Sequence, residues 1–201
     1  MYKLFLKIAT RYLLKNKMYS FINIFGLAIG VASFVLIMLY VNHEKSYDKF
    51  EGSEHVYRVY MDYLEGDKYV PGDAEAYIAS GPALKAEFPE ILDFVRFRRI
   101  NNLVVLKDNH PYDNIVGSLA DPEYFNVFDH NLVKGSVETA LNEPYSIVLS
   151  TVLAKKIFGD GNPIGQALKI AGDGTTTFTV TGVMDNSGRN THIKNDLLVS
   201  F

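Results

Sequence analysis

The stretch FINIFGLAIGVASFVLIMLYV, residues 21–41, decides how the chain is organised. None of its 21 residues is Asp, Glu, Lys or Arg, and its clearly polar members are Asn23 and Ser33. As an α-helix it is about 32 Å long, close to the roughly 30 Å hydrocarbon core of a bilayer. A buried helix of a soluble protein seldom stays uncharged over this length. The stretch therefore predicts a transmembrane helix.

A cleavable signal peptide is the main alternative for an apolar segment so near the N-terminus. The apolar part of a signal peptide usually has about 7–15 residues and ends at a cleavage site of small residues. Here the apolar run is longer, and it leads into Asn42-His43-Glu44-Lys45 without an A-x-A pattern. We therefore expect the helix to be retained in the protein.

The residues before the span are basic, although the whole chain has a net charge of −3. Residues 1–20 contain no acid, and their cations are Lys3, Lys7, Arg11, Lys15 and Lys17. Basic flanks favour the cytoplasmic side of a membrane. We therefore expect residues 1–20 in the cytoplasm, residues 21–41 across the membrane and residues 42–201 on the other side of it.

Four of these cations recur every four residues and would form one stripe on a helix. This spacing predicts an amphipathic helix that lies on anionic lipid headgroups. A disordered basic tail that only sets the topology is the alternative.

Small residues follow one face of the predicted span. Gly26 and Gly30 form a GxxxG pattern, and Ser33 lies about one turn further along. This spacing lets the backbones of two membrane helices approach closely. Glycine is also frequent in membrane helices without such a role. We interpret Gly26, Gly30 and Ser33 as the candidate packing site.

Residues 42–201 predict a mixed α+β domain with more strands than helices. A helix is expected to open at Ser80-Gly81-Pro82, with Pro82 in its first turn, and to run through residue 88. Further helices are expected over residues 121–125 and over Thr151–Phe158, the latter with Ser150 as the N-cap. Strands are expected over residues 55–60, in a second stretch interrupted at residues 65–67, twice within 91–106, and over 166–171 and 177–184, which form a hairpin. Turns are expected at 65–67, at 162–165 and at Gly172-Asp173-Gly174.

The search for a catalytic, metal or cofactor site finds none in the sequence. The chain has no Cys, which excludes disulfides, a thiol nucleophile and Cys-ligated metals. It also lacks the G-x-x-x-x-G-K-[ST] pattern that binds phosphates, and its five His do not occur at metal-ligand spacing. Gly159 to Gly165 fits a helix end and a turn better than a nucleotide or calcium loop. We predict no enzyme activity, no cofactor, no metal and no nucleic-acid partner.

Two further clusters are interpreted as surface features. Asp129-His130 is read as a polar pair on a loop. Arg96, Arg98 and Arg99 are read as a solvated face of a strand, with Arg96 and Arg98 on the same side.

Several segments resemble one family, the MacB/FtsX-type permeases of ABC transporters. Residues 12–17 with 21–30 look like the start of such permeases, and Ser46-Tyr47-Asp48-Lys49-Phe50 followed by residues 56–59 is similar to the next segment. Residues 153–160, 162–165 and 178–183 resemble the signature of the MacB-like periplasmic core domain. These segments occur in the family's order along the chain, and the leader and the ending, His192 to Phe201, resemble Bacteroidota members.

The resemblance implies an inner-membrane permease that partners with an ABC ATPase and forms a homodimer or heterodimer. It also implies a two-lobed periplasmic domain that contacts a periplasmic substrate or partner protein, whereas membrane lipid is the expected partner of the basic residues 1–20. Further membrane helices are expected after that domain, so the chain is expected to be an N-terminal fragment. The sequence names no substrate for export or extraction.

Two other classes of protein are alternatives to a permease. The first is a membrane-anchored extracytoplasmic sensory or binding domain. A neighbouring gene for a kinase or a regulator would favour this class, whereas a neighbouring gene for an ABC ATPase would favour the permease. The second is a membrane-anchored hydrolase, for which the chain lacks a catalytic set. The mechanism that fits a permease is mechanical: the span would continue as a helix into residues 46–50 and pass its motion to the periplasmic domain.

Overall fold

The computed structural model describes residues 2–72, 74–171, 175–185 and 190–201. The chain divides into two compact units, Met1–Tyr47 and Asp48–Phe201. Each unit has its own internal packing, so each is described by itself.

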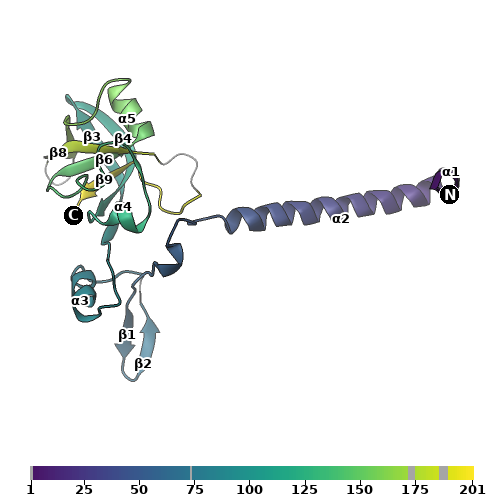
Figure 1. The fold of residues 1–201 in the computed structure, drawn as a ribbon, viewed down its shortest axis with the longest axis horizontal. Helices are drawn as coiled ribbons and strands as arrows, with labels where there is room; N and C mark the ends of the chain where they lie inside the picture. The colour runs from purple at the N-terminus through teal and green to yellow at the C-terminus, as the bar shows by residue number, and fades with distance from the viewer. Residues whose placement is uncertain (1, 73, 172–174, 186–189) are drawn as a thin grey trace. The chain divides into compact units, whose positions relative to one another are not determined.

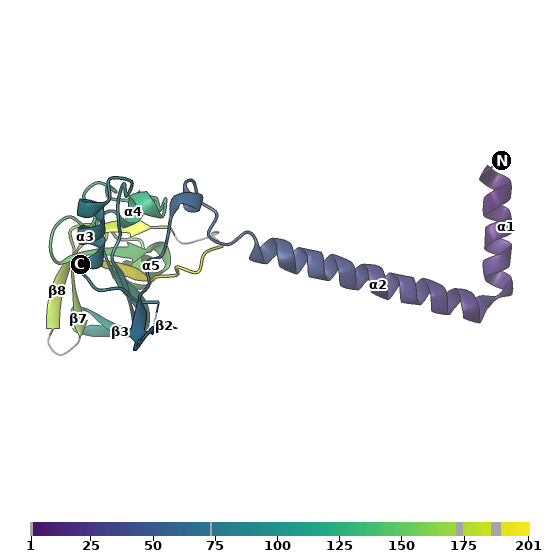
Figure 2. The same ribbon diagram turned by 90° about the horizontal axis from the view of Figure 1, so that it is seen from below.

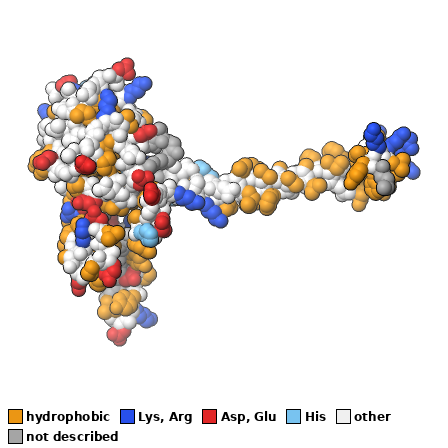
Figure 3. Space-filling view, viewed as in Figure 1, with side chains coloured by type: hydrophobic (Ala, Val, Ile, Leu, Met, Phe, Trp, Pro, Cys, Tyr) orange, Lys and Arg blue, Asp and Glu red, His pale blue; other side chains and the backbone are white. Residues whose placement is uncertain are grey.

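The N-terminal unit consists of two helices, α1 (Tyr2–Lys15) and α2 (Lys17–Glu44). Asn16 separates them, because its φ of −114° and ψ of 56° are not helical. Figure 2 shows the chain turning a corner at this point. Helix α2 contains the whole predicted span, and apolar side chains follow it along its length (Figure 3). Among the described residues, α2 is the one helix long and apolar enough to cross a membrane.

The second unit is rich in strands (Figure 1). Its elements are η1 (Ser53–His55), β1 (Asp62–Glu65), β2 (Lys68–Pro71), α3 (Ser80–Glu87), β3 (Phe97–Lys107), β4 (His110–Ala120), α4 (Tyr124–Val127), β5 (Leu132–Lys134), β6 (Ser146–Ser150), α5 (Thr151–Phe158), β7 (Ala167–Ala171), β8 (Thr175–Met184) and β9 (Leu197–Ser200).

The main sheet has the strand order β5-β8-β6-β9-β4-β3-β7. Strand β7 also pairs with β8, so the strands β7, β8, β6, β9, β4 and β3 form a closed ring. The β6–β8 and β4–β9 pairs are parallel, whereas the other pairs are antiparallel. Closing the ring leaves few unpaired strand edges. Strands β1 and β2 form a separate hairpin with a turn at Gly66 and Asp67.

The hydrophobic core lies on both faces of this sheet. Alternate residues of one strand point to opposite faces: Ile147 and Leu149 of β6 pack in a first cluster with Leu153 of α5. Val148 between them packs in a second cluster with Tyr124 and Phe125 of α4. Strands β6 and β9 are consequently buried along their whole length.

Gly117 of β4 shows how closely this core is filled. A Cβ built on Gly117 would lie 2.5 Å from Cδ1 of Leu197 and 2.7 Å from Cδ1 of Leu103. The glycine therefore leaves room for the side chains of the two neighbouring strands.

The structure confirms the mixed α+β class and several predicted elements. Helix α3 spans Ser80–Glu87 and ends before Pro89. Ser150 caps α5, since its Oγ accepts a hydrogen bond of 3.1 Å from the Leu153 N–H. Strands β7 and β8 pair as the expected hairpin, and the turn predicted at Gly172-Asp173-Gly174 lies outside the described residues.

Three predictions were wrong. Residues 91–106 do not hold two strands: β3 starts at Phe97 and runs on to Lys107, and its partner β4 went unpredicted. Residues 55–60 form no strand, because no neighbouring strand pairs with them. Helix α2 does not continue into residues 46–50, since it ends at Glu44 and a turn follows.

Candidate functional site

The predicted membrane-surface residues all lie in the N-terminal unit and are exposed. Lys3, Lys7, Arg11 and Lys15 are on α1, and Lys17 begins α2. Alternating with them are large exposed apolar side chains, among them Leu4, Phe5 and Ile8. Such a combination suits the surface of an anionic bilayer, and lipid binding by these residues stays a prediction.

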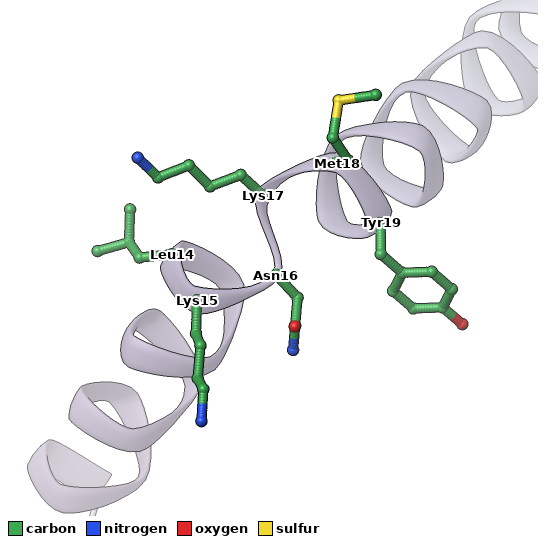
Figure 4. Close-up of a pocket in the computed structure, with 6 residues that line it drawn as sticks. All are labelled: Leu14, Lys15, Asn16, Lys17, Met18 and Tyr19. Atoms are coloured by element: carbon green, nitrogen blue, oxygen red, sulfur yellow. The ribbon is translucent and has the colours of Figure 1, made fainter.

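The corner between α1 and α2 forms an open hollow (Figure 4). Six consecutive residues line it, from Leu14 to Tyr19. The side chains of Lys15, Lys17 and Tyr19 point away from one another in this view. Nothing there converges on a common point, so the hollow offers no ligand-binding constellation.

The predicted helix-packing residues lie on an open face of α2. A Cβ built on Gly26 or Gly30 would meet no atom of the chain within 4 Å. Ser33 is exposed as well. A close partner for this face would be a helix outside these 201 residues, and such packing stays a prediction.

The chain that leaves α2 is anchored to the second unit at Asp48. The N–H of Asp48 donates a hydrogen bond of 2.8 Å to the carbonyl oxygen of Asn190. Its Oδ1 accepts hydrogen bonds from the Thr191 hydroxyl at 2.6 Å and from the His192 N–H at 3.1 Å. Its Oδ2 lies 2.6 Å from Nδ1 of His192. One aspartate thus holds three consecutive residues of a distant segment.

This arrangement changes the acidity of Asp48. Its partial burial would raise the pKa, but the hydrogen bonds from Thr191 and His192 and the charge of His192 lower the pKa below its usual value. The carboxylate is therefore ionised over the physiological pH range. The backbone of Asp48 has a φ of 51°, a left-handed conformation that Asp and Asn tolerate better than most residues.

A second contact lies two residues further along. The ring of Phe50 meets the ring of Phe128 edge to face, with centroids 6.0 Å apart. Phe128 follows α4 and packs against the second core cluster. Asp48 and Phe50 therefore both tie residues 48–50 to the sheet unit.

Arg96 and Asp121 form an ion pair where the chain enters β3. Two nitrogens of the Arg96 guanidinium donate to the Asp121 carboxylate at distances of 2.7–3.1 Å. These hydrogen bonds raise the pKa of Arg96 above its usual value. The Asp121 side chain is only 4% exposed, and the guanidinium carbon lies 4.3 Å from the ring centroid of Phe201. Arg96 therefore precedes β3 and is not part of a solvated strand face, in contrast to the prediction.

His130 also differs from its prediction as a surface residue. It is 5% exposed and stacks on the ring of Tyr124 at a centroid distance of 5.2 Å. Its neighbour Asp129 adopts a left-handed φ of 48°, which turns His130 into the core.

The described ranges of the chain hold no group of three or more His, Asp or Glu side chains that could bind a metal ion.

The anchoring residues were only partly visible in the sequence. Residues 46–50 stood out by resemblance, but nothing in the local pattern indicated that Asp48 contacts Thr191 and His192, more than 140 positions away. The Arg96–Asp121 pair was missed because its members are 25 positions apart and lie outside regular periodicity. Both are long-range contacts that depend on the fold of the sheet.

Together, α2 and the sheet unit define a class of protein: a membrane-anchored chain with a domain outside the cytoplasm. The chain belongs to the family of the MacB-like periplasmic core domain, whose sequence model matches residues 20–201. This domain is the periplasmic domain of ABC-transporter permeases. A comparison with curated proteins found no match.

Two solved structures are similar to parts of this chain. A domain described as part of a permease protein of Porphyromonas gingivalis has a TM-score of 0.57 and 25% identity, covering 69% of this chain and 59% of that chain. The periplasmic region of MacB from Actinobacillus actinomycetemcomitans has a TM-score of 0.48 and 17% identity, covering 61% and 54%. The chain thus spans a little over half of the length of these structures.

Proposed function

We propose that this chain is part of the permease subunit of an ABC transporter of the MacB/FtsX type. In this proposal a partner ATPase hydrolyses ATP in the cytoplasm, and α2 transmits the resulting motion to the periplasmic sheet unit. The observation that carries the proposal is the family match over residues 20–201 on a chain that includes α2. The permease would act as a homodimer or heterodimer in the inner membrane.

The residues of α2 favour a mechanical role over a channel. Between Lys17 and Glu44 the helix has no charged residue, and the polar side chains of its apolar centre are Asn23 and Ser33. An aqueous path through a membrane is normally lined by polar or ionisable groups. A helix of this composition is suited to shifting or tilting as a rigid rod, and its open face at Gly26 and Gly30 would accept a second helix.

The test measures the motion directly in the permease that contains this chain, reconstituted with its ATPase in nanodiscs. The 201 residues contain no Cys, so a donor fluorophore can be placed at Asp113→Cys in β4, with an acceptor on the lipid headgroups of the nanodisc. We expect the distance between the donor and the headgroups to differ between the nucleotide-free and the vanadate-trapped states. An unchanged distance, at normal ATP hydrolysis, would overturn the mechanical proposal.

A flexible insertion tests the rigid transmission. A Gly/Ser segment of about ten residues between Lys45 and Ser46 would uncouple the two units without altering either fold. We expect ATP hydrolysis to persist and the nucleotide-dependent distance change to disappear. A rigid helical insertion of the same length, made of Glu, Ala and Lys, is the matched control. Equal distance changes in the flexible variant and the wild type would contradict the proposal.

A further inference from the structure

The chain crosses from the first unit to the second at the peptide bond between Tyr47 and Asp48. A displacement of α2 that passes along the chain enters the sheet unit through this bond. Asp48 is the first residue beyond it, and Asp48 is held at once by hydrogen bonds to Asn190, Thr191 and His192. The position of these contacts, at the start of the second unit, is what makes them informative.

The residues that follow Asp48 along the chain form a poor route for force. From Val41 to Asn102, none of the described residues is buried, and the first buried residue is Leu103 in β3. A segment with few buried contacts opens and deforms easily. The contacts of this region with the second core cluster are Phe50 on Phe128, close to Asp48, and Val95 and Phe97, which lie far along the chain from Asp48.

The route through His192 is much shorter. Strand β9 begins at Leu197, five positions after His192. It lies between β4 and β6 in the centre of the sheet, and all four of its residues are buried. Asp196 strengthens this route, because its Oδ2 accepts a 2.9 Å hydrogen bond from the Val116 N–H of β4.

We propose that Asp48, Thr191 and His192 form a latch that couples the chain leaving α2 to strand β9 and so to the rigid sheet. This inference rests on the proposed function and names the residues through which its motion would pass. The carboxylate suits the task, because hydrogen bonds to a charged group are stronger than those between neutral groups. Two of its bonds involve backbone N–H groups, namely the Asp48 N–H itself and the His192 N–H, so the latch also holds main chain.

The variants are chosen to break the latch without disturbing the core. Thr191→Val removes the hydroxyl that donates to Asp48 and keeps the size of the side chain. Asp48→Gly removes the carboxylate and fits the left-handed φ of 51°. Thr191→Ser keeps the hydroxyl and is the conservative variant. Asp93→Gly is the matched control, because Asp93 accepts comparable hydrogen bonds from Lys85 and the Phe94 N–H.

The measurement is the same distance, between a donor at Asp113→Cys and the lipid headgroups, in the permease reconstituted with its ATPase. We expect Thr191→Val and Asp48→Gly to reduce the nucleotide-dependent distance change by about half or more, at an unchanged ATPase rate. Thr191→Ser and Asp93→Gly should keep the full change. Hydrogen exchange of β6 and β9 verifies that the sheet is intact. If Asp48→Gly fails to fold, the result with Thr191→Val alone tests the latch.

The possible results separate the two proposals. A wild type that shows the distance change, with latch variants that show it equally, would overturn the latch and leave the proposed function standing. A wild type without any distance change would overturn the proposed function, and the coupling role of the latch with it. Loss of the change in Asp93→Gly as well would also overturn the latch, because the effect would then not be specific to residues 48, 191 and 192.

Discussion

Asp121 is the most deeply buried carboxylate that forms a described ion pair in this chain, and its partner Arg96 is 32% exposed at the side chain. Removing one member of a buried pair leaves the other without compensation, at a cost of about 3–5 kcal/mol. Because Arg96 retains access to water, we expect Asp121→Ala to lower the free energy of unfolding by about 3 kcal/mol. Urea unfolding followed by circular dichroism measures this, since the chain has no Trp to report by fluorescence.

The control for Asp121 is Asp93→Ala. It removes the Lys85–Asp93 pair, in which both side chains are at least one third exposed. Exposed pairs contribute little, so the free energy of unfolding should hardly change. Equal losses in the two variants would contradict the role of burial in the Arg96–Asp121 pair.

Asp48 gives the latch a dependence on pH. Its pKa is lowered in the folded state, so its contribution to stability is present above the pKa of the unfolded chain, about 3.9. That contribution is lost as the pH falls through the lower folded-state value. We expect the stability difference between the wild type and Asp48→Asn to be present at about pH 5 and to shrink below about pH 4.

Urea unfolding at a series of pH values measures this difference. Asp113→Asn, at an exposed position of β4, is the control and should show no such trend. A difference that grows as the pH falls toward 3 would contradict the assignment, because a protonated Asp48 would then be the stabilising form.

At the scale of elements, α5 depends on its N-cap. The Ser150 Oγ accepts from the Leu153 N–H, and Leu153 and Ala154 of the same helix pack in the first core cluster. Loss of a serine N-cap typically costs about 1 kcal/mol. We therefore expect Ser150→Ala to lower the free energy of unfolding by about 1 kcal/mol. Ser150→Thr keeps a hydroxyl at the cap and should retain most of this stabilisation. A loss in Ser150→Thr as large as that in Ser150→Ala would indicate that the packing of the buried side chain, and not the cap, is responsible.

The elements that the sequence predicted correctly are those with local signals. Helix α5 has a capping serine and a terminal glycine, α3 starts near Pro82, and α2 has a long uncharged run. Strand β4 was missed because Pro111, Asn114 and Gly117 interrupt its alternation. Its pairing with β3 and β9 compensates for these residues, and such pairing is a property of the tertiary fold.

The same distinction holds for the site. The basic residues and the small-residue face were visible in the sequence because both repeat at helical spacing. The contacts of Asp48 with Thr191 and His192 join residues that no local pattern relates. They form only when the turn after α2 and the segment before β9 are brought together by the folded sheet unit.

At the scale of the whole molecule, the distribution of charge predicts the orientation in the membrane. Five cations and no acid precede the span, whereas Glu44, Lys45, Asp48, Lys49 and Glu51 give a mixed charge just beyond it. Because basic residues near a span are retained in the cytoplasm, we expect the N-terminus inside and residues 48–201 outside. Cells with a permeabilised outer membrane can report this through single cysteines and a membrane-impermeant maleimide.

We expect Asp113→Cys in β4 to be labelled in such cells and Lys3→Cys in α1 to be labelled only after the inner membrane is opened. Replacing the four other N-terminal cations with Gln in the Lys3→Cys variant should make part of the population label at position 3, because the charge difference that sets the orientation is then gone. Replacing four lysines of the sheet unit with Gln, far along the chain from α2, is the matched control and should leave the pattern unchanged; these are Lys134, Lys155, Lys156 and Lys169. Labelling of Lys3→Cys in intact spheroplasts of the unmodified chain would reverse the assigned orientation, and with it the side of the membrane on which an ATPase could meet α1.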